Sequence, residues 1–209
     1  MKRKNERTKE RKNSFLVLQF FSSSVGNGFT LAELLIAMSI FLVVTLITIM
    51  SFRSGEKVEQ LRFAVENVAQ EVRALQVFAR TGQRQGSKVP KGGFGMQMLQ
   101  CTQSPCTFIP FGDQNMDGRY APNEQLPESI TFAPRVILEK LETKDSGGIV
   151  SPRSGVVLIA RSPYGDFAVH DLAGVVIPAT ELTLTFRQTE LDHTRSLTIN
   201  IPSGQIRRE

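Results

Sequence analysis

Residues 34–52 read LLIAMSIFLVVTLITIMSF, a run of nineteen residues without a charged side chain. At about 1.5 Å per residue, a helix of this length is roughly 28 Å long, close to the thickness of a membrane's hydrocarbon core. The run therefore predicts a transmembrane helix. A buried helix in the core of a soluble protein is the alternative that fits the same composition.

The net charge of +5 arises entirely in front of this run. Residues 1–13 carry seven Lys or Arg and two Asp or Glu, and the remaining 18 basic and 18 acidic side chains cancel. Basic flanks stay on the cytoplasmic side of a membrane, so we expect a cytoplasmic N-terminus, a single pass and residues 53–209 outside. The neutral remainder argues against a large electrostatic surface for nucleic acid.

The composition and motifs of the sequence exclude several classes of protein. A hydrophobic content of 41% excludes general disorder, and two cysteines exclude both a disulfide scaffold and a four-cysteine zinc site. The sequence holds no P-loop, G-x-S-x-G, H-E-x-x-H or G-x-G-x-x-G pattern. Neither His170 nor His193 has an evident nucleophile or carboxylate set, so we expect no enzyme.

One acidic residue, Glu33, lies at the edge of the apolar run. An isolated carboxylate is unfavourable by about 2.5–3.5 kcal/mol at the centre of a bilayer and by less near the interface. Glu33 therefore either has a partner or reaches the membrane surface.

Residues 28–44, GFTLAELLIAMSIFLVV, resemble the N-terminal processing motif of type IV prepilins and pseudopilins. The family's Gly, Phe and Glu positions fall on Gly28, Phe29 and Glu33. The resemblance implies that a membrane aspartyl prepilin peptidase cuts between Gly28 and Phe29 and methylates the new amine of Phe29. It also implies that Glu33 meets the N-terminal amine of a neighbouring subunit during assembly. An amine with a pKa of about 7.7–8.0 is cationic and can neutralise this carboxylate.

Residues 1–28 are accordingly expected to be a prepilin leader, although two features differ from the family. The leader is long, and its last basic residue, Lys12, lies far from the cut. An apolar run at 15–21 followed by three serines also resembles an ordinary secretory signal, so cleavage by a conventional signal peptidase is the alternative.

Apolar residues continue at spacings of three and four beyond the span, at Val58, Leu61, Val65, Val68, Val72, Leu75 and Ala79. No proline lies between positions 29 and 89, so one helix is predicted from Phe29 to about Arg80, with a transmembrane half at 29–53 and an amphipathic half at 54–81. The stripe could serve a coiled coil. Its short length favours packing on the domain that follows, as in pilins.

Residues 82–209 are predicted to form a β-rich extracytoplasmic domain. The expected strands are 94–100, 107–110, 129–132, 136–141, 155–160, 167–170, 182–187 and 196–201, separated by Gly, Asp, Ser and Pro turns. One long helix followed by strands predicts an α+β fold of type IV pilin-like architecture, with the helix packed on an antiparallel sheet. The order of features is similar to that of FimT/GspH-like pseudopilins.

Cys101 and Cys106 lie five positions apart. An extracytoplasmic compartment is oxidising, which favours a disulfide that closes a small loop. Two free thiols are the alternative.

A calcium-binding pattern, D-x-[DN]-x-[DN]-G-x5-E, is matched in full by Asp113, Asn115, Asp117, Gly118 and Glu124. Calcium prefers oxygen ligands, which three alternate side chains, the carbonyl of Arg119 and a bidentate Glu124 would supply. The prolines at 110, 122 and 127 exclude the usual flanking helices, and Asp, Asn and Gly also form ordinary β-turns. Calcium is therefore a candidate cofactor, with a plain turn as the alternative.

The basic pair Arg207 and Arg208 ends the sequence beside Glu209. Some FimT-like minor pilins bind DNA through basic residues at a comparable position, although Gln205 stands where they have arginine. The expected function is a structural subunit of a type IV pilus or type II secretion pseudopilus. Its partners would be prepilin peptidase, other pilins and the inner-membrane assembly platform. A filament-tip module that captures DNA or a surface is the alternative.

Overall fold

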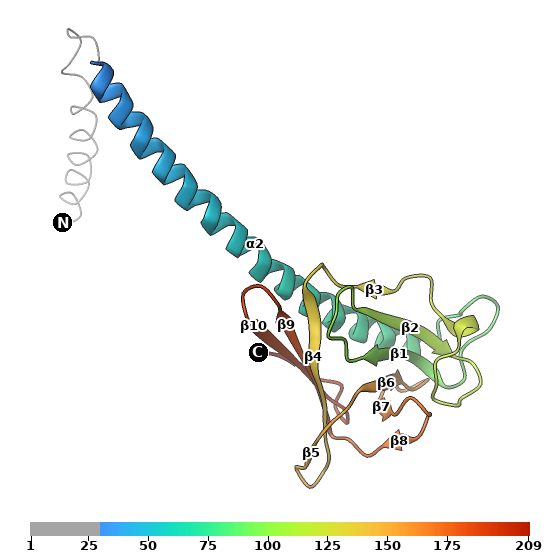
Figure 1. Ribbon diagram of the computed structural model, residues 1–209. Helices are drawn as coiled ribbons and strands as arrows, with labels where there is room; N and C mark the ends of the chain where they lie inside the picture. The colour runs from blue at the N-terminus through green and yellow to red at the C-terminus, as the bar shows by residue number, and fades with distance from the viewer. Residues whose placement is uncertain (1–29) are drawn as a thin grey trace, which may run out of the picture. The chain divides into compact units, whose positions relative to one another are not determined.

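The computed structural model describes residues 30–209, the side chains of 50–53 excepted (Figure 1). The predictions for the leader, Gly28 and Phe29 lie outside the described residues. The chain divides into two compact units between Met50 and Ser51.

Helix α2 runs from Leu31 to Thr81, close to the predicted bounds. Its first turns present an apolar surface, because the large hydrophobic side chains from Leu31 to Ile49 are exposed. The helix ends at Gly82, whose φ of 62° is the left-handed conformation that favours glycine. The amide of Gln83 then donates to the carbonyl of Phe78 at 3.1 Å, the longer of the two hydrogen bonds of a Schellman motif.

The second half of α2 packs on its own β domain. Six positions of the predicted stripe are buried, namely Leu61, Val65, Val68, Val72, Leu75 and Ala79. Ala64 and Ala69 are buried beside them and let the helix backbone approach the sheets closely. The apolar stripe of α2 is thus buried against the β domain of the same chain. This confirms packing on the sheets rather than a coiled coil.

The β domain contains two antiparallel sheets, both beside the later part of α2 in Figure 1. The first has the order β3-β2-β1-β6-β7-β8, with β1 Gly93–Leu99, β2 Thr107–Asp113, β3 Ile130–Thr131, β6 Gly155–Ala160, β7 Phe167–His170 and β8 Val176–Ile177. The second has the order β11-β10-β9-β4-β5, with β4 Val136–Lys144, β5 Val150–Pro152, β9 Glu181–Gln188, β10 His193–Asn200 and β11 Ile206–Arg208. A short 3-10 turn, η2 Pro122–Glu124, follows β2. The α+β pilin-like arrangement is confirmed.

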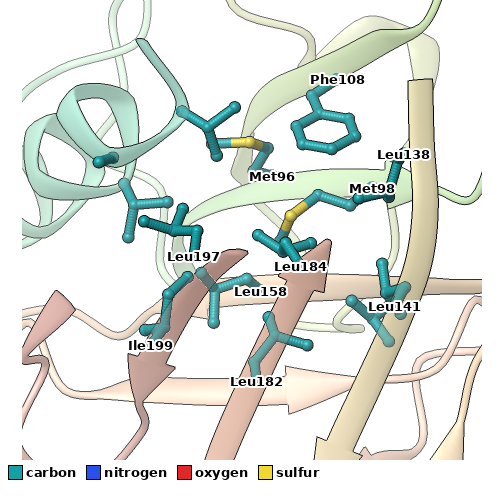
Figure 2. Close-up of a cluster of buried hydrophobic side chains, with 14 of the residues drawn as sticks. Met96, Met98, Phe108, Leu138, Leu141, Leu158, Leu182, Leu184, Leu197 and Ile199 are labelled. Carbon is teal, nitrogen blue, oxygen red and sulfur yellow. The ribbon is translucent and has the colours of Figure 1, made fainter. Parts of the chain in front are cut away.

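The main core lies where the two sheets and α2 meet. Figure 2 shows side chains from both sheets pointing toward one another, among them Met96 and Met98 of β1 and Leu182 and Leu184 of β9. Strand β9 alternates buried and half-buried residues along its whole length, so one face enters the core.

Strand β6 is buried on both faces. Its outer residues, Val157 and Ile159, form a second small core with Phe111, and Tyr120 packs against it. Tyr120 belongs to the segment between β2 and η2, so this segment covers the outer face of the first sheet.

Candidate functional site

Thr30 and Glu33 form a capping box at the start of α2. The backbone amide of Thr30 donates to Oε2 of Glu33 at 2.9 Å, and the amide of Glu33 donates to Oγ1 of Thr30 at 3.2 Å. The Thr30 hydroxyl also lies 3.0 Å from Oε2. The T-x-x-E spacing in the sequence could have identified Thr30 as the local partner of Glu33. Gly28 and Phe29 lie outside the described residues.

The hydroxyl groups inside the apolar part of α2 are satisfied by the helix itself. Ser39 Oγ donates to the carbonyl of Ile36 at 2.7 Å, and Thr45 Oγ1 donates to that of Phe41 at 2.7 Å. Thr48 Oγ1 likewise donates to a carbonyl of the helix, that of Val44. All three hydroxyl groups therefore have hydrogen-bond partners without water. This arrangement, with the exposed apolar side chains, fits single-pass membrane anchoring.

The candidate calcium residues lie in the segment that runs from the end of β2 to η2. Asp113 is 2% exposed and accepts two backbone hydrogen bonds, from Met116 at 2.7 Å and from Gly118 at 3.2 Å. Met116 and Gly118 have φ values of 65° and 71°, so the chain turns tightly around this carboxylate. Gly92 faces it from the other side, where an added Cβ would lie 2.2 Å from Oδ2.

Asn115 and Asp117 continue the turn nearer the surface. Oδ1 of Asn115 accepts from the amide of Asp117 at 3.1 Å, and Oδ1 of Asp117 accepts from the amide of Arg119 at 2.8 Å. The other oxygen of Asp117 accepts from the side-chain amide of Asn115 at 2.9 Å. Within residues 30–209, no three His, Cys, Asp or Glu side chains gather into a group that could hold a metal ion.

Glu124 closes the segment from η2. It is 2% exposed, and its Oε1 accepts from the amide of Gln114 at 3.1 Å. Its Oε2 is buried and has no hydrogen-bond partner among the described residues. Burial raises the pKa of this carboxyl, and the charges of Asp113 and Asp117 raise it further.

The same segment contacts the turn between β7 and β8. Arg119 Nε donates to the carbonyl of Ala173, and Nδ1 of His170 lies 3.0 Å from the carbonyl of Gly174. An added Cβ on Gly118 would lie 2.4 Å from Nδ1 of His170. The glycine of the pattern is therefore required for contact with β7 as well as for the turn.

Cys101 and Cys106 have bonded sulfur atoms, with Cα atoms 5.9 Å apart, a separation usual for disulfides. Cys106 is buried, and the amide of Cys101 donates to the carbonyl of Leu138 at 3.3 Å. The pair therefore lies where the β1–β2 connection meets β4 of the second sheet.

The two C-terminal arginines have different surroundings. Both lie on β11, where Arg207 pairs with Thr198 and Arg208 pairs with Leu197 of β10. Arg208 forms an ion pair with Glu66 of α2, and because side chains alternate along a strand, Arg207 lies on the other face of β11; both arginines are exposed. The structure does not bring the two guanidinium groups together on one surface.

Comparison with protein families matches the prokaryotic N-terminal methylation motif at residues 26–49. No curated protein and no solved structure matches the chain. The matched segment contains the Gly28–Phe29 junction, Glu33 and most of the apolar run. The N-terminal segment of this chain therefore carries the methylation motif, which supports a protein of type IV prepilin or pseudopilin type.

Proposed function

We propose that the chain is a minor pilin or pseudopilin, cut after Gly28 and assembled into a filament of a type IV pilus or type II secretion system. The observation that carries the proposal is the methylation motif placed directly before an apolar helix, whose continuation packs on a β domain. Such an arrangement indicates a structural subunit rather than an enzyme.

Before assembly, residues 29–53 would hold the subunit in the inner membrane. The basic block at 1–13 would keep the leader in the cytoplasm and the β domain outside. During assembly, the apolar surface of α2 would leave the lipid and pack against the same surface of other subunits.

Processing is tested by N-terminal sequencing and intact mass of membrane-extracted protein co-expressed with a prepilin peptidase. The expected product starts at Phe29 and carries one added methyl group. Gly28→Arg, which places a long charged side chain next to the cut, should leave the leader attached. A mature start near residue 25, or an uncut wild-type chain, would contradict the proposal and favour a conventional signal.

Glu33 would act in assembly by exchanging its partner. In the single chain its carboxylate is held by the amide and hydroxyl of Thr30. The methylated amine of a neighbouring Phe29 carries a full positive charge and forms a stronger, charge-assisted hydrogen bond. The exchange would set the register between successive subunits.

The capping box supplies a matched pair of variants for this step. Glu33→Ala removes the carboxylate, whereas Thr30→Ala removes only the cap hydroxyl and leaves the carboxylate in place. We expect both to be processed, Glu33→Ala to be lost from sheared filaments and Thr30→Ala to remain in them. Equal loss of both variants would assign Glu33 to helix capping alone.

Capture of DNA through Arg207 and Arg208 is the weaker proposal, because Arg208 is already paired with Glu66. Its test is salt-dependent binding of the chain to duplex DNA, compared with Arg207→Ala/Arg208→Ala. Equal binding by both proteins, or no binding at low salt, would remove it.

A further inference from the structure

We propose that residues 113–124 bind a calcium ion through Asp113 and Glu124, and that the bound ion fastens this segment over the outer face of the first sheet. This proposal does not rest on leader processing or on filament assembly.

The decisive observation is a buried carboxylate oxygen without a partner. Glu124 is 2% exposed, and its Oε2 accepts no hydrogen bond of normal geometry within the described residues, although the nearby amide of Ala121 favours the ionised carboxyl. Its other oxygen accepts from Gln114 inside the same segment, which directs the carboxyl group into the turn. A buried unpaired oxygen is unfavourable, and a cation bound there would satisfy it.

The neighbouring groups are those that calcium prefers. Asp113 is equally buried and lies in the same segment, and its charge acts on Glu124. In the described part of the chain, neither carboxylate forms an ion pair with a lysine or arginine. Two buried acids of one segment, Asp113 and Glu124, are thus close enough for the charge of one to act on the other, and neither is paired with a basic side chain.

Neutral oxygens would complete the coordination. Asn115 and the carbonyl of Arg119 occupy alternate positions of the turn, and water can fill the remaining places. Asp117 holds its oxygens against Arg119 and Asn115, so it would contribute only after rotating its side chain. Such a set favours weak binding, with a Kd of about 10⁻⁴–10⁻³ M, the range of extracellular calcium modules.

Calcium binding would stabilise more than the turn itself. Tyr120 stacks edge-on against Phe111 with ring centroids 5.8 Å apart, and Arg119 contacts the β7–β8 turn through Ala173. Fixing residues 113–124 therefore fixes the cover over Val157 and Ile159 of β6.

Calcium binding can be followed by the fluorescence of a tyrosine in the segment itself. It has no tryptophan and two tyrosines, Tyr120 inside the segment and Tyr164 outside it. In a Tyr164→Phe background, the fluorescence of the full chain in detergent comes from Tyr120 alone. We expect calcium chloride, but not magnesium chloride at equal concentration, to change this signal in a saturable way. Calcium at about 100-fold above Kd should raise the melting temperature by roughly 5–10 °C.

The variant Glu124→Gln shows whether Glu124 is a calcium ligand or only a structural residue. Without calcium, it should fold and melt no lower than the parent, because it removes a buried charge. With calcium, it should lose the fluorescence change and the shift in melting temperature. Glu128→Gln, an exposed acid four positions away, should keep both. The proposal is overturned if millimolar calcium gives no response, if magnesium gives the same response, or if Glu124→Gln responds like the parent.

Discussion

In the described part of the chain, Glu71 on the domain half of α2 has a raised pKa, as Glu124 does. Partial burial is the main cause, and the charge of Glu128 adds to it. The unfolded carboxyl ionises near pH 4.3, so between that pH and the higher folded pKa the folded state binds more protons. Stability contributed by this group is therefore present at low pH and is lost as the pH rises through that window.

Glu71→Gln tests this directly. The amide cannot ionise, so we expect the variant to melt higher than the parent at pH 7, by roughly 1–3 °C after allowance for solvent screening. Near pH 4 the two proteins should melt together. The opposite pH dependence, with a deficit at pH 7, would show that the Glu71 carboxylate is stabilised by a partner.

At the scale of elements, the packing of α2 is tested by two apolar residues on opposite faces. Leu75 is fully buried under the sheets, whereas Val77 is 54% exposed. We expect Leu75→Ala to lower the free energy of unfolding by about 2–5 kcal/mol and Val77→Ala to change it by less than about 0.5 kcal/mol. Urea unfolding of the two variants gives the comparison. A large loss for Val77→Ala would mean that this face of the helix also packs against a partner.

The disulfide between Cys101 and Cys106 is a covalent link within the β domain. In the chain-entropy description, closing a loop of this size stabilises the folded state by about 2 kcal/mol. We propose that the bond forms in the oxidising compartment. The parent should then melt lower after reduction, whereas Cys101→Ser/Cys106→Ser should melt at the reduced value in both conditions. A parent that is indifferent to reductant and reacts with a thiol reagent when folded would contradict the bond.

The sequence predicted the elements whose pattern is local. The apolar run and the 3-4 spacing predicted α2, and alternation predicted β9 and most of β10. Strands β5, β8 and β11 were not among the expected strands, because two or three residues at a sheet edge are defined by their neighbour. Strand β2 was expected to end at Pro110 but continues to Asp113. The carbonyl of Pro110 accepts from Leu126, so the missing N–H faces away from β1 and interrupts no pairing there.

For the candidate sites too, the sequence predicted what depends on local spacing and not what depends on distant neighbours. The spacing from Asp113 to Glu124 was evident in the sequence, but the burial of both carboxylates is a feature of the tertiary structure, in which Gly92 lies against Asp113. The pairing of Arg208 with Glu66 joins residues 142 positions apart, which no local pattern reveals. Thr30 is different, because its capping partner Glu33 lies three residues away, so the sequence alone could have indicated this pair.

For the whole molecule, the charge block at 1–13 is expected to decide which side of the membrane receives the β domain. Replacing its seven Lys and Arg by Gln should leave part of the population with residues 53–209 inside, because the bias between the two flanks is lost. External protease on spheroplasts should then spare the domain in that part of the population. Glu6→Gln/Glu10→Gln keeps the basic residues and should leave the domain accessible, as in the parent.

The short outer strands have a consequence for crowded subunits. Each sheet ends in strands of two or three residues, β3 and β8 in one and β5 and β11 in the other. Long open edges recruit strands from other molecules and lead to aggregation. Copies held side by side on a membrane or in a filament meet at very high local concentration. The outer strands themselves offer few free backbone groups for such recruitment, which favours contact between neighbouring domains through side chains.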